Sequence, residues 1–188
     1  QSSRSRLPER KSLMKLSGEA AFHPDGLLCS VGAAKGAVQI FDVRKQSAVA
    51  SLPEHTDRVL SLDFSENGYY LATGGAGGQA ICWDLRKLQK NSKLQKRSAW
   101  AADCCRDSDS TVSANNGCIK KLDLGGNACS SVCFDHSGSY LAVASNDVQV
   151  YKAKKWALLA TYEGHKAAVS SVAFAADAQS VISGSMDR

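Results

Sequence analysis

The stretch Phe64-Ser65-Glu66-Asn67-Gly68-Tyr69-Tyr70-Leu71-Ala72-Thr73 joins a short apolar run that ends at Phe64 to a second apolar run beyond a turn. Asn-Gly accepts the positive φ angles of a two-residue reversal, so the stretch predicts a β-hairpin. The same pattern recurs at Phe22 to Gly26, at Phe134 to Gly138 and, more weakly, at Phe174 to Ala178. The chain therefore contains an internal repeat.

The spacing of the repeat indicates its architecture. Phe22 and Phe64 are 42 residues apart and Phe134 and Phe174 are 40 apart, whereas Phe64 and Phe134 are 70 apart, which is one period plus an insertion. A period near 40 is typical of β-propeller blades. Sustained 3.6-residue periodicity is absent, which excludes helical repeats of similar length. We predict an all-β fold.

Each hairpin is followed by a third run with alternating apolar residues, around Val38 and Ile40, over Ala80 to Leu85, and at Val148 and Val150. A fourth strand is expected in each unit. Its candidates are Ala48 to Leu52, either Leu94 to Ser98 or Ile119 to Leu124, and Leu158 to Tyr162.

Residues around the hairpins resemble the WD40 repeat, since His55 and His165 each lie nine residues before a repeat Phe and Trp83-Asp84 ends a third strand. In that family a His, a Ser or Thr, an Asp and the Trp form a hydrogen-bonded set, and their donors and acceptors can satisfy one another when buried. Glu54 and the turn Ala76-Gly77-Gly78 depart from the pattern. The resemblance implies two sets: His55, Thr73 and Trp83, and His165, Ser183 and Asp187.

A closer similarity is to the C-terminal propellers of the spliceosomal U-box ubiquitin ligases. It is carried by Phe22 to Leu27, Phe64 to Thr73, Trp83 to Leu88, Asp147 to Tyr151 and Met186 to Arg188. It implies about four blades of a seven-bladed WD40 β-propeller, the last one truncated. It also implies a nuclear ligase in pre-mRNA splicing and DNA repair, with spliceosomal proteins and ubiquitination substrates as partners. A U-box that recruits the ubiquitin-conjugating enzyme and a tetramerising coiled coil would lie outside these residues. Because the chain begins at Gln1, we expect a part of a longer protein.

The repeat divides the chain into units. We expect a basic tail or a remnant of a preceding blade at 1–17, WD40 units at 18–52 and 53–88, an irregular insertion at 89–118, a degenerate unit at 119–160 and a truncated unit at 161–188. The insertion is interpreted either as a lineage-specific loop or as a translated intron.

Composition limits the chemistry. The 188 residues are 44% hydrophobic and 22% charged, which is typical of a globular domain, and no apolar stretch is long enough for a membrane span. The net charge of +5 comes from two basic runs, Arg4 to Lys15 and Arg86 to Arg97, while the remainder is mildly acidic. We therefore do not expect direct nucleic-acid binding.

Seven scattered cysteines suit a reducing compartment, and the adjacent pair Cys104-Cys105 lacks metal-ligand spacing.

Function is expected to reside in binding rather than catalysis. We predict no catalytic residue, no cofactor and no metal, because ligases of this type act by bringing reactants together. The alternative is a generic WD40 scaffold with no ligase link. Loops at one end of the strands are the expected docking sites. The candidate partner-binding residues are Lys35, Asp57, Arg58, Asn146, Lys166 and Met186.

Overall fold

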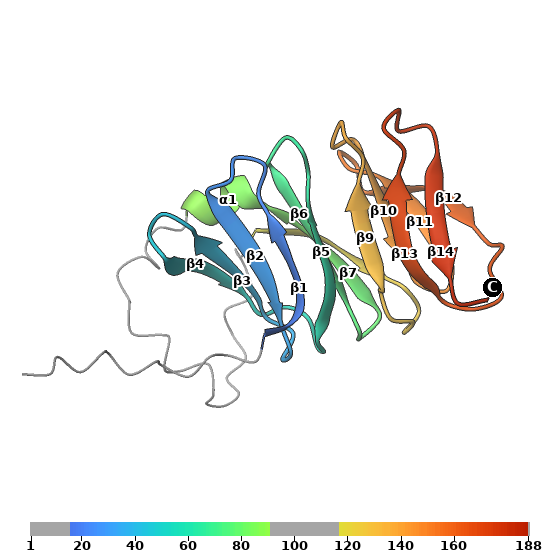
Figure 1. Ribbon diagram of the computed structural model, residues 1–188, viewed down its shortest axis with the longest axis horizontal. Coiled ribbons are helices and arrows are strands. Elements are labelled where there is room, and N and C mark those ends of the chain that lie inside the picture. Colours follow the sequence, from blue (N-terminus) through green and yellow to red (C-terminus); the bar gives the residue numbers. More distant parts are fainter. Residues whose placement is uncertain (1–15, 91–116, 188) are drawn as a thin grey trace, which may run out of the picture.

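The computed structural model describes residues 16–90 and 117–187, which form antiparallel sheets that stand side by side in sequence order (Figure 1). We call these sheets blades 1 to 4. Blade 1 comprises β1 (Leu16–Phe22), β2 (Leu28–Ala33), β3 (Val38–Asp42) and β4 (Ser47–Leu52). Blade 2 comprises β5 (Val59–Phe64), β6 (Tyr70–Gly75), β7 (Gln79–Asp84) and β8 (Cys118–Asp123). Blade 3 comprises β9 (Ser131–Phe134), β10 (Tyr140–Ala144), β11 (Val148–Lys152) and β12 (Ala157–Tyr162), and blade 4 comprises β13 (Val169–Phe174) and β14 (Val181–Ser185).

This arrangement confirms the prediction of an all-β fold built from propeller blades. Within each blade, strands that follow one another in the sequence pair with one another, so every connection is short except the one between β7 and β8. The described residues include one short helix, α1 (Leu85–Lys90), which the sequence did not predict. The Asp84 carboxylate accepts a hydrogen bond from the Arg86 backbone at 3.1 Å and so caps the start of α1.

The hairpin turns differ from the two-residue reversal that the Asn-Gly pattern suggested. In blade 2, the Gly68 amide donates to the Ser65 carbonyl at 2.7 Å and Gly68 has a φ of 69°, while Asn67 is not among the residues with a positive φ. The Asn67 side chain instead accepts hydrogen bonds from the Ser65 hydroxyl and the Tyr69 amide. The reversal is therefore longer, and only its glycine takes the left-handed conformation.

The fourth strand of blade 2 comes from beyond the insertion. β8 pairs with β7 through partners such as Cys82 with Lys120 and Gln79 with Asp123. Of the two sequence candidates for this strand, Ile119 to Leu124 matches it, while Leu94 to Ser98 lies outside the described residues, as does most of the insertion. Blade 2 thus includes residues on both sides of the expected boundary between 118 and 119.

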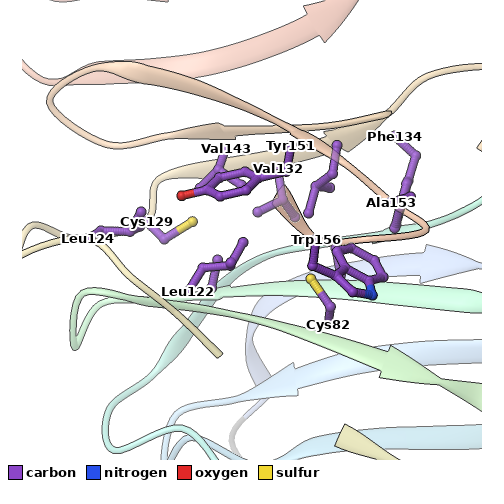
Figure 2. Packing of buried hydrophobic residues seen from close by; sticks show 13 residues of the cluster. Cys82, Leu122, Leu124, Cys129, Val132, Phe134, Val143, Tyr151, Ala153 and Trp156 are labelled. Atoms are coloured by element: carbon purple, nitrogen blue, oxygen red, sulfur yellow. The ribbon is translucent and has the colours of Figure 1, made fainter. Parts of the chain in front are cut away.

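The hydrophobic core lies between neighbouring blades. In β7, Ile81 and Trp83 pack against blade 1, whereas Ala80 and Cys82 pack toward blade 3, because successive side chains of a strand point to opposite faces. All four are fully buried. Figure 2 shows the second of these interfaces, where Cys82 lies near Trp156 of blade 3.

The innermost strands β1, β5, β9 and β13 are held together by a repeated hydrogen bond. The acceptor is a side-chain oxygen three residues before the repeat Phe of one blade. The donor is the backbone amide two residues before the repeat Phe of the next blade. Glu19 accepts from Leu62 at 3.1 Å, Ser61 from Val132 at 3.1 Å and Ser131 from Val172 at 3.4 Å. We call this series the inter-blade seam, and it satisfies amides that no strand pairing reaches.

Candidate functional site

The loop before β5 is tied to the middle of blade 2 by a buried hydrogen-bond network. His55 Nε2 lies 2.7 Å from Thr73 Oγ1, and Trp83 Nε1 donates to the same oxygen at 3.0 Å. The Thr73 hydroxyl donates to the Ile81 carbonyl at 3.3 Å. His55 is 7% exposed and the Thr73 and Trp83 side chains are fully buried. The residues that the resemblance grouped together therefore meet around one hydroxyl.

The Thr73 hydroxyl has three partners but a single proton. It accepts from Trp83 Nε1, and His55 Nε2 lies closer to it than the Ile81 carbonyl does. Burial lowers the pKa of His55 to about 4, and the nearby Lys121 ammonium acts in the same direction. The imidazole is therefore neutral at physiological pH.

The equivalent network in blade 4 has a different composition. His165 Nδ1 lies 3.2 Å from an Asp187 carboxylate oxygen, and His165 Nε2 lies 2.9 Å from the Ser183 hydroxyl. The Lys166 backbone amide donates to the same carboxylate at 2.7 Å. This amide and then the imidazole lower the pKa of Asp187. The structure thus brings all three residues of the second predicted set together.

Blade 2 lacks the carboxylate that Asp187 supplies in blade 4. The position in blade 2 that corresponds to Asp187 is Gly77. A Cβ at Gly77 would overlap the hydroxyl of Thr56. Glu54 instead forms an ion pair with Lys121 of β8 at 2.7 Å. Sequence reasoning missed this contact because Lys121 lies 67 residues from Glu54, beyond the insertion.

Three of the six candidate partner-binding residues come together between blades 1 and 2. Lys35 lies in the β2–β3 turn, and Asp57 and Arg58 lie in the loop before β5; all three are exposed. A Cβ at Gly36 would overlap the carbonyl oxygen of His55, so the turn and the loop are in close contact. The structure therefore places these charged side chains on neighbouring loops.

The other three candidates lie at the corresponding ends of blades 3 and 4. Asn146 occupies the β10–β11 turn, and its neighbour Ser145 accepts the Val169 amide at 2.8 Å from the loop that contains Lys166. Met186 follows β14 and is 84% exposed. Lys166 and Met186 are brought close by the bond between the Lys166 amide and Asp187. These residues form a second group of exposed side chains.

The thiols within the described residues are poorly suited to nucleophilic chemistry. Cys82 and Cys129 are buried, and burial raises the pKa of both, that of Cys129 to about 12. A thiol held in its protonated form is a weak nucleophile and a weak metal ligand. Residues 16–90 and 117–187 hold no group of three His, Cys, Asp or Glu side chains that could bind a metal ion. The pair Cys104-Cys105 lies outside them.

The part of the chain that the structure describes also has no helix with the length and apolar character required to cross a bilayer.

Comparison with known proteins identifies the repeats. The family model described as "WD domain, G-beta repeat" matches residues 46–84 and 156–188, which include every member of both hydrogen-bond networks. The two matched segments centre on blades 2 and 4.

Curated relatives extend the similarity to most of the chain. Pre-mRNA-processing factor 19 homolog 2 of Arabidopsis thaliana is 38% identical over 175 residues, and pre-mRNA-processing factor 19 of Oryza sativa subsp. japonica is 37% identical over 175. The Homo sapiens protein of that name is 35% identical over 169 residues. Each alignment covers 90% of this chain but only 27%, 28% and 28% of the respective relative. The chain thus spans little more than a quarter of the length of these proteins.

Proposed function

Because this chain is a WD40-repeat homologue of pre-mRNA-processing factor 19, we propose that it is a protein-binding scaffold that acts in pre-mRNA splicing. The similarity over 90% of the chain is the observation that carries the proposal. The name of the relatives indicates the process, and the blades supply a framework that presents loops to other proteins. The scaffold would therefore work by holding partners in position.

The proposed docking surface is the end of the blades that carries the two groups of exposed loops. Its first group combines Lys35, Asp57 and Arg58, so positive and negative side chains lie on adjacent loops. Mixed charges favour a protein partner over a polyanion, because a nucleic-acid surface needs a consistently basic face. The buried network at His55 and the partly buried network at His165 hold these loops in place.

A more specific function rests on the similarity of the sequence to the spliceosomal U-box ubiquitin ligases. We infer that the chain is the substrate-positioning part of a nuclear U-box ubiquitin ligase with further work in DNA repair. In this proposal a U-box elsewhere in the protein recruits the ubiquitin-conjugating enzyme, and a coiled coil assembles a tetramer. Ubiquitin transfer would then depend on proximity, which explains why the chain needs no nucleophile of its own.

Affinity purification of the native protein from nuclear extract, followed by peptide mass spectrometry, tests both levels. We expect splicing proteins among the partners and U-box peptides from the same polypeptide. A partner set without splicing proteins contradicts the scaffold proposal. Splicing partners without a U-box leave a WD40 scaffold with no ligase link.

A pair of charge-reversal variants tests the docking surface in the same experiment. Arg58→Glu should remove a subset of the splicing partners, because it inverts the charge of a loop in the first group. Lys120→Glu makes the same charge change on the exposed outer strand β8 and should leave the partners unchanged. Equal partner sets for Arg58→Glu and the unmodified protein would exclude this loop from docking.

A further inference from the structure

A cavity of about 500 Å³ lies where β5, β9 and β13 run into their turns. Its lining residues include Phe64, Phe134 and Phe174, of which the first two are 6% exposed. Asp63, Glu66 and Asp135 supply the charged part of the lining, which contains no lysine or arginine. The cavity is therefore acidic, with apolar residues beside the carboxylates.

The three carboxylates differ in the hydrogen bonds and ion pairs that they already form. Asp135 belongs to its own turn, where it accepts hydrogen bonds from the Ser137 amide and hydroxyl and from the Tyr140 amide. Among the residues that the structure describes, no ion pair joins Asp63 or Glu66 to a cation. These two acids are the ones whose charge is available inside the cavity.

Comparison between blades shows that the fold does not require either charge. Asp63 immediately precedes the repeat Phe of blade 2, and Glu66 follows that Phe by two residues. The counterparts of Asp63 are Ala21, Cys133 and Ala173, and those of Glu66 are Pro24, His136 and Ala176. The other blades form the same hairpins without a carboxylate at either place.

Asp63 also has an internal role that an uncharged residue could fill. Its carboxylate accepts the Phe134 amide at 2.6 Å, beside the inter-blade seam. An asparagine side chain has a carbonyl oxygen that accepts the same bond. Burial, with the charges of Glu19 and Glu66, raises the pKa of Asp63 to about 6, so the carboxylate is held at a cost in free energy. The hydrogen bond alone therefore does not explain why a carboxylate stands here.

We propose that this cavity binds the side chain of an arginine or lysine presented by a partner protein, with Asp63 and Glu66 as counter-ions. A basic side chain combines a cationic head with an aliphatic stem, and the cavity offers carboxylates for the first and apolar lining residues such as Phe174 and Ala176 for the second. The negative charge of the lining disfavours nucleic acid. The site lies at the opposite end of β5 from Asp57 and Arg58, so it goes beyond the docking surface proposed above and is tested separately.

Fluorescence anisotropy with the full chain tests the proposal. The probes are short labelled peptides of glycine and serine that are identical except for a central Arg, Lys, Gln or Glu. We expect the Arg and Lys peptides to bind at least about tenfold more tightly than the Gln and Glu peptides. Equal binding of the Arg and Gln peptides, or no binding of any peptide, overturns the proposal. Neither result bears on which proteins co-purify with the chain.

Matched variants locate the binding. Asp63→Asn keeps the acceptor for Phe134 and should weaken binding of the Arg peptide about tenfold, and Glu66→Gln, at an exposed position, should weaken it in the same direction. Asp123→Asn removes the same charge from the exposed strand β8 and should have no effect. An equal loss in Asp63→Asn and Asp123→Asn would show general charge attraction and would contradict a site in the cavity. Unchanged binding in both Asp63→Asn and Glu66→Gln would contradict it as well.

Discussion

His55 and His165 occupy the same place in blades 2 and 4, yet a carboxylate bonds the ring of His165 and a glycine stands at the corresponding place in blade 2. In blade 4, the Asp187 carboxylate can only accept, so His165 Nδ1 must carry a hydrogen. In blade 2, Gly77 supplies no carboxylate, while His55 Nε2 contacts the Thr73 hydroxyl as His165 Nε2 contacts that of Ser183. One difference in the repeat therefore changes the partners of a histidine twenty-two positions away.

Thr73 is the residue on which the blade 2 network depends. Thr73→Val keeps the shape but leaves Trp83 Nε1 without its acceptor and His55 Nε2 without its partner, and we expect it to lower the free energy of unfolding by about 2–4 kcal/mol. Thr73→Ser keeps the hydroxyl and should cost clearly less. Urea denaturation at low protein concentration, followed by tryptophan fluorescence, measures both. Equal losses in the two variants would assign the effect to the methyl group and not to the hydrogen bonds.

Asp63 should make the stability of the fold depend on pH. Because its pKa in the folded protein is about 6, above the usual carboxyl range, its favourable contribution is present in acid and is lost as the pH rises through 6. Asp63→Asn should therefore increase the free energy of unfolding by on the order of 2 kcal/mol at about pH 7.5 and have little effect at about pH 4. Thermal melts across this range measure the difference. The prediction is wrong if the gain is independent of pH or larger in acid.

At the scale of the element, the seam shows how blades that share no strand are joined. Each bond links a side chain of one inner strand to the backbone of the next, and the serines Ser61 and Ser131 occupy identical places in their blades. The bonds fix the register between blades as well as contributing stability, since a shift of one residue would remove all of them.

Serine variants test the seam. Ser61→Ala should lower the free energy of unfolding by about 1 kcal/mol or more, because it leaves the Val132 amide without its acceptor between two blades. Ser171→Ala is the matched control, since Ser171 occupies the same place in blade 4 and is exposed. Chemical denaturation of both proteins gives the comparison. A Ser61→Ala protein as stable as Ser171→Ala would show that the seam bond adds nothing.

Sequence alone predicted the features that depend on neighbouring residues. The strands of the hairpins follow from turns and spacings that recur within one repeat, and the members of the two histidine networks, Thr73 among them, were implied by the resemblance to the WD40 repeat. The seam was not predicted, because Ser61 and Ser131 resemble any polar residue of an alternating strand. The Glu54–Lys121 pair and α1 were also missed: the first crosses the insertion, and the second begins inside a basic run that is typical of a solvated loop.

For the whole molecule, the described blades form an open series whose last sheet has two strands. Apolar side chains are exposed along this side, including Ile182 of β14 at 66% and Leu158, Leu159 and Tyr162 of β12 at more than half. Unpaired strand edges with apolar side chains are templates for pairing with other molecules. The described residues thus expose apolar side chains at both ends of the series, since Phe22 of blade 1 is 68% exposed.

A polypeptide of residues 1–188 on its own should therefore self-associate. Size-exclusion chromatography with light scattering should show oligomers or aggregates that increase with concentration, and Ile182→Lys should reduce them by placing a charge on the exposed face. Lys120→Glu, which changes a charge that is already exposed on β8, should leave the amount of oligomer unchanged. A monodisperse monomer with a sharp, reversible melting transition would contradict this expectation.

The connection between β7 and β8 has a consequence in time. While the chain is being made, β4 emerges only a few residues after β3, so blade 1 can be completed almost at once. β8 begins at Cys118, well after β7 ends at Asp84, and at about 5–20 residues per second the ribosome needs on the order of a few seconds to supply it. Throughout that interval the edge of β7 is without its neighbour. The insertion leaves the finished blade intact but makes blade 2 slower to complete during synthesis than blades 1 and 3.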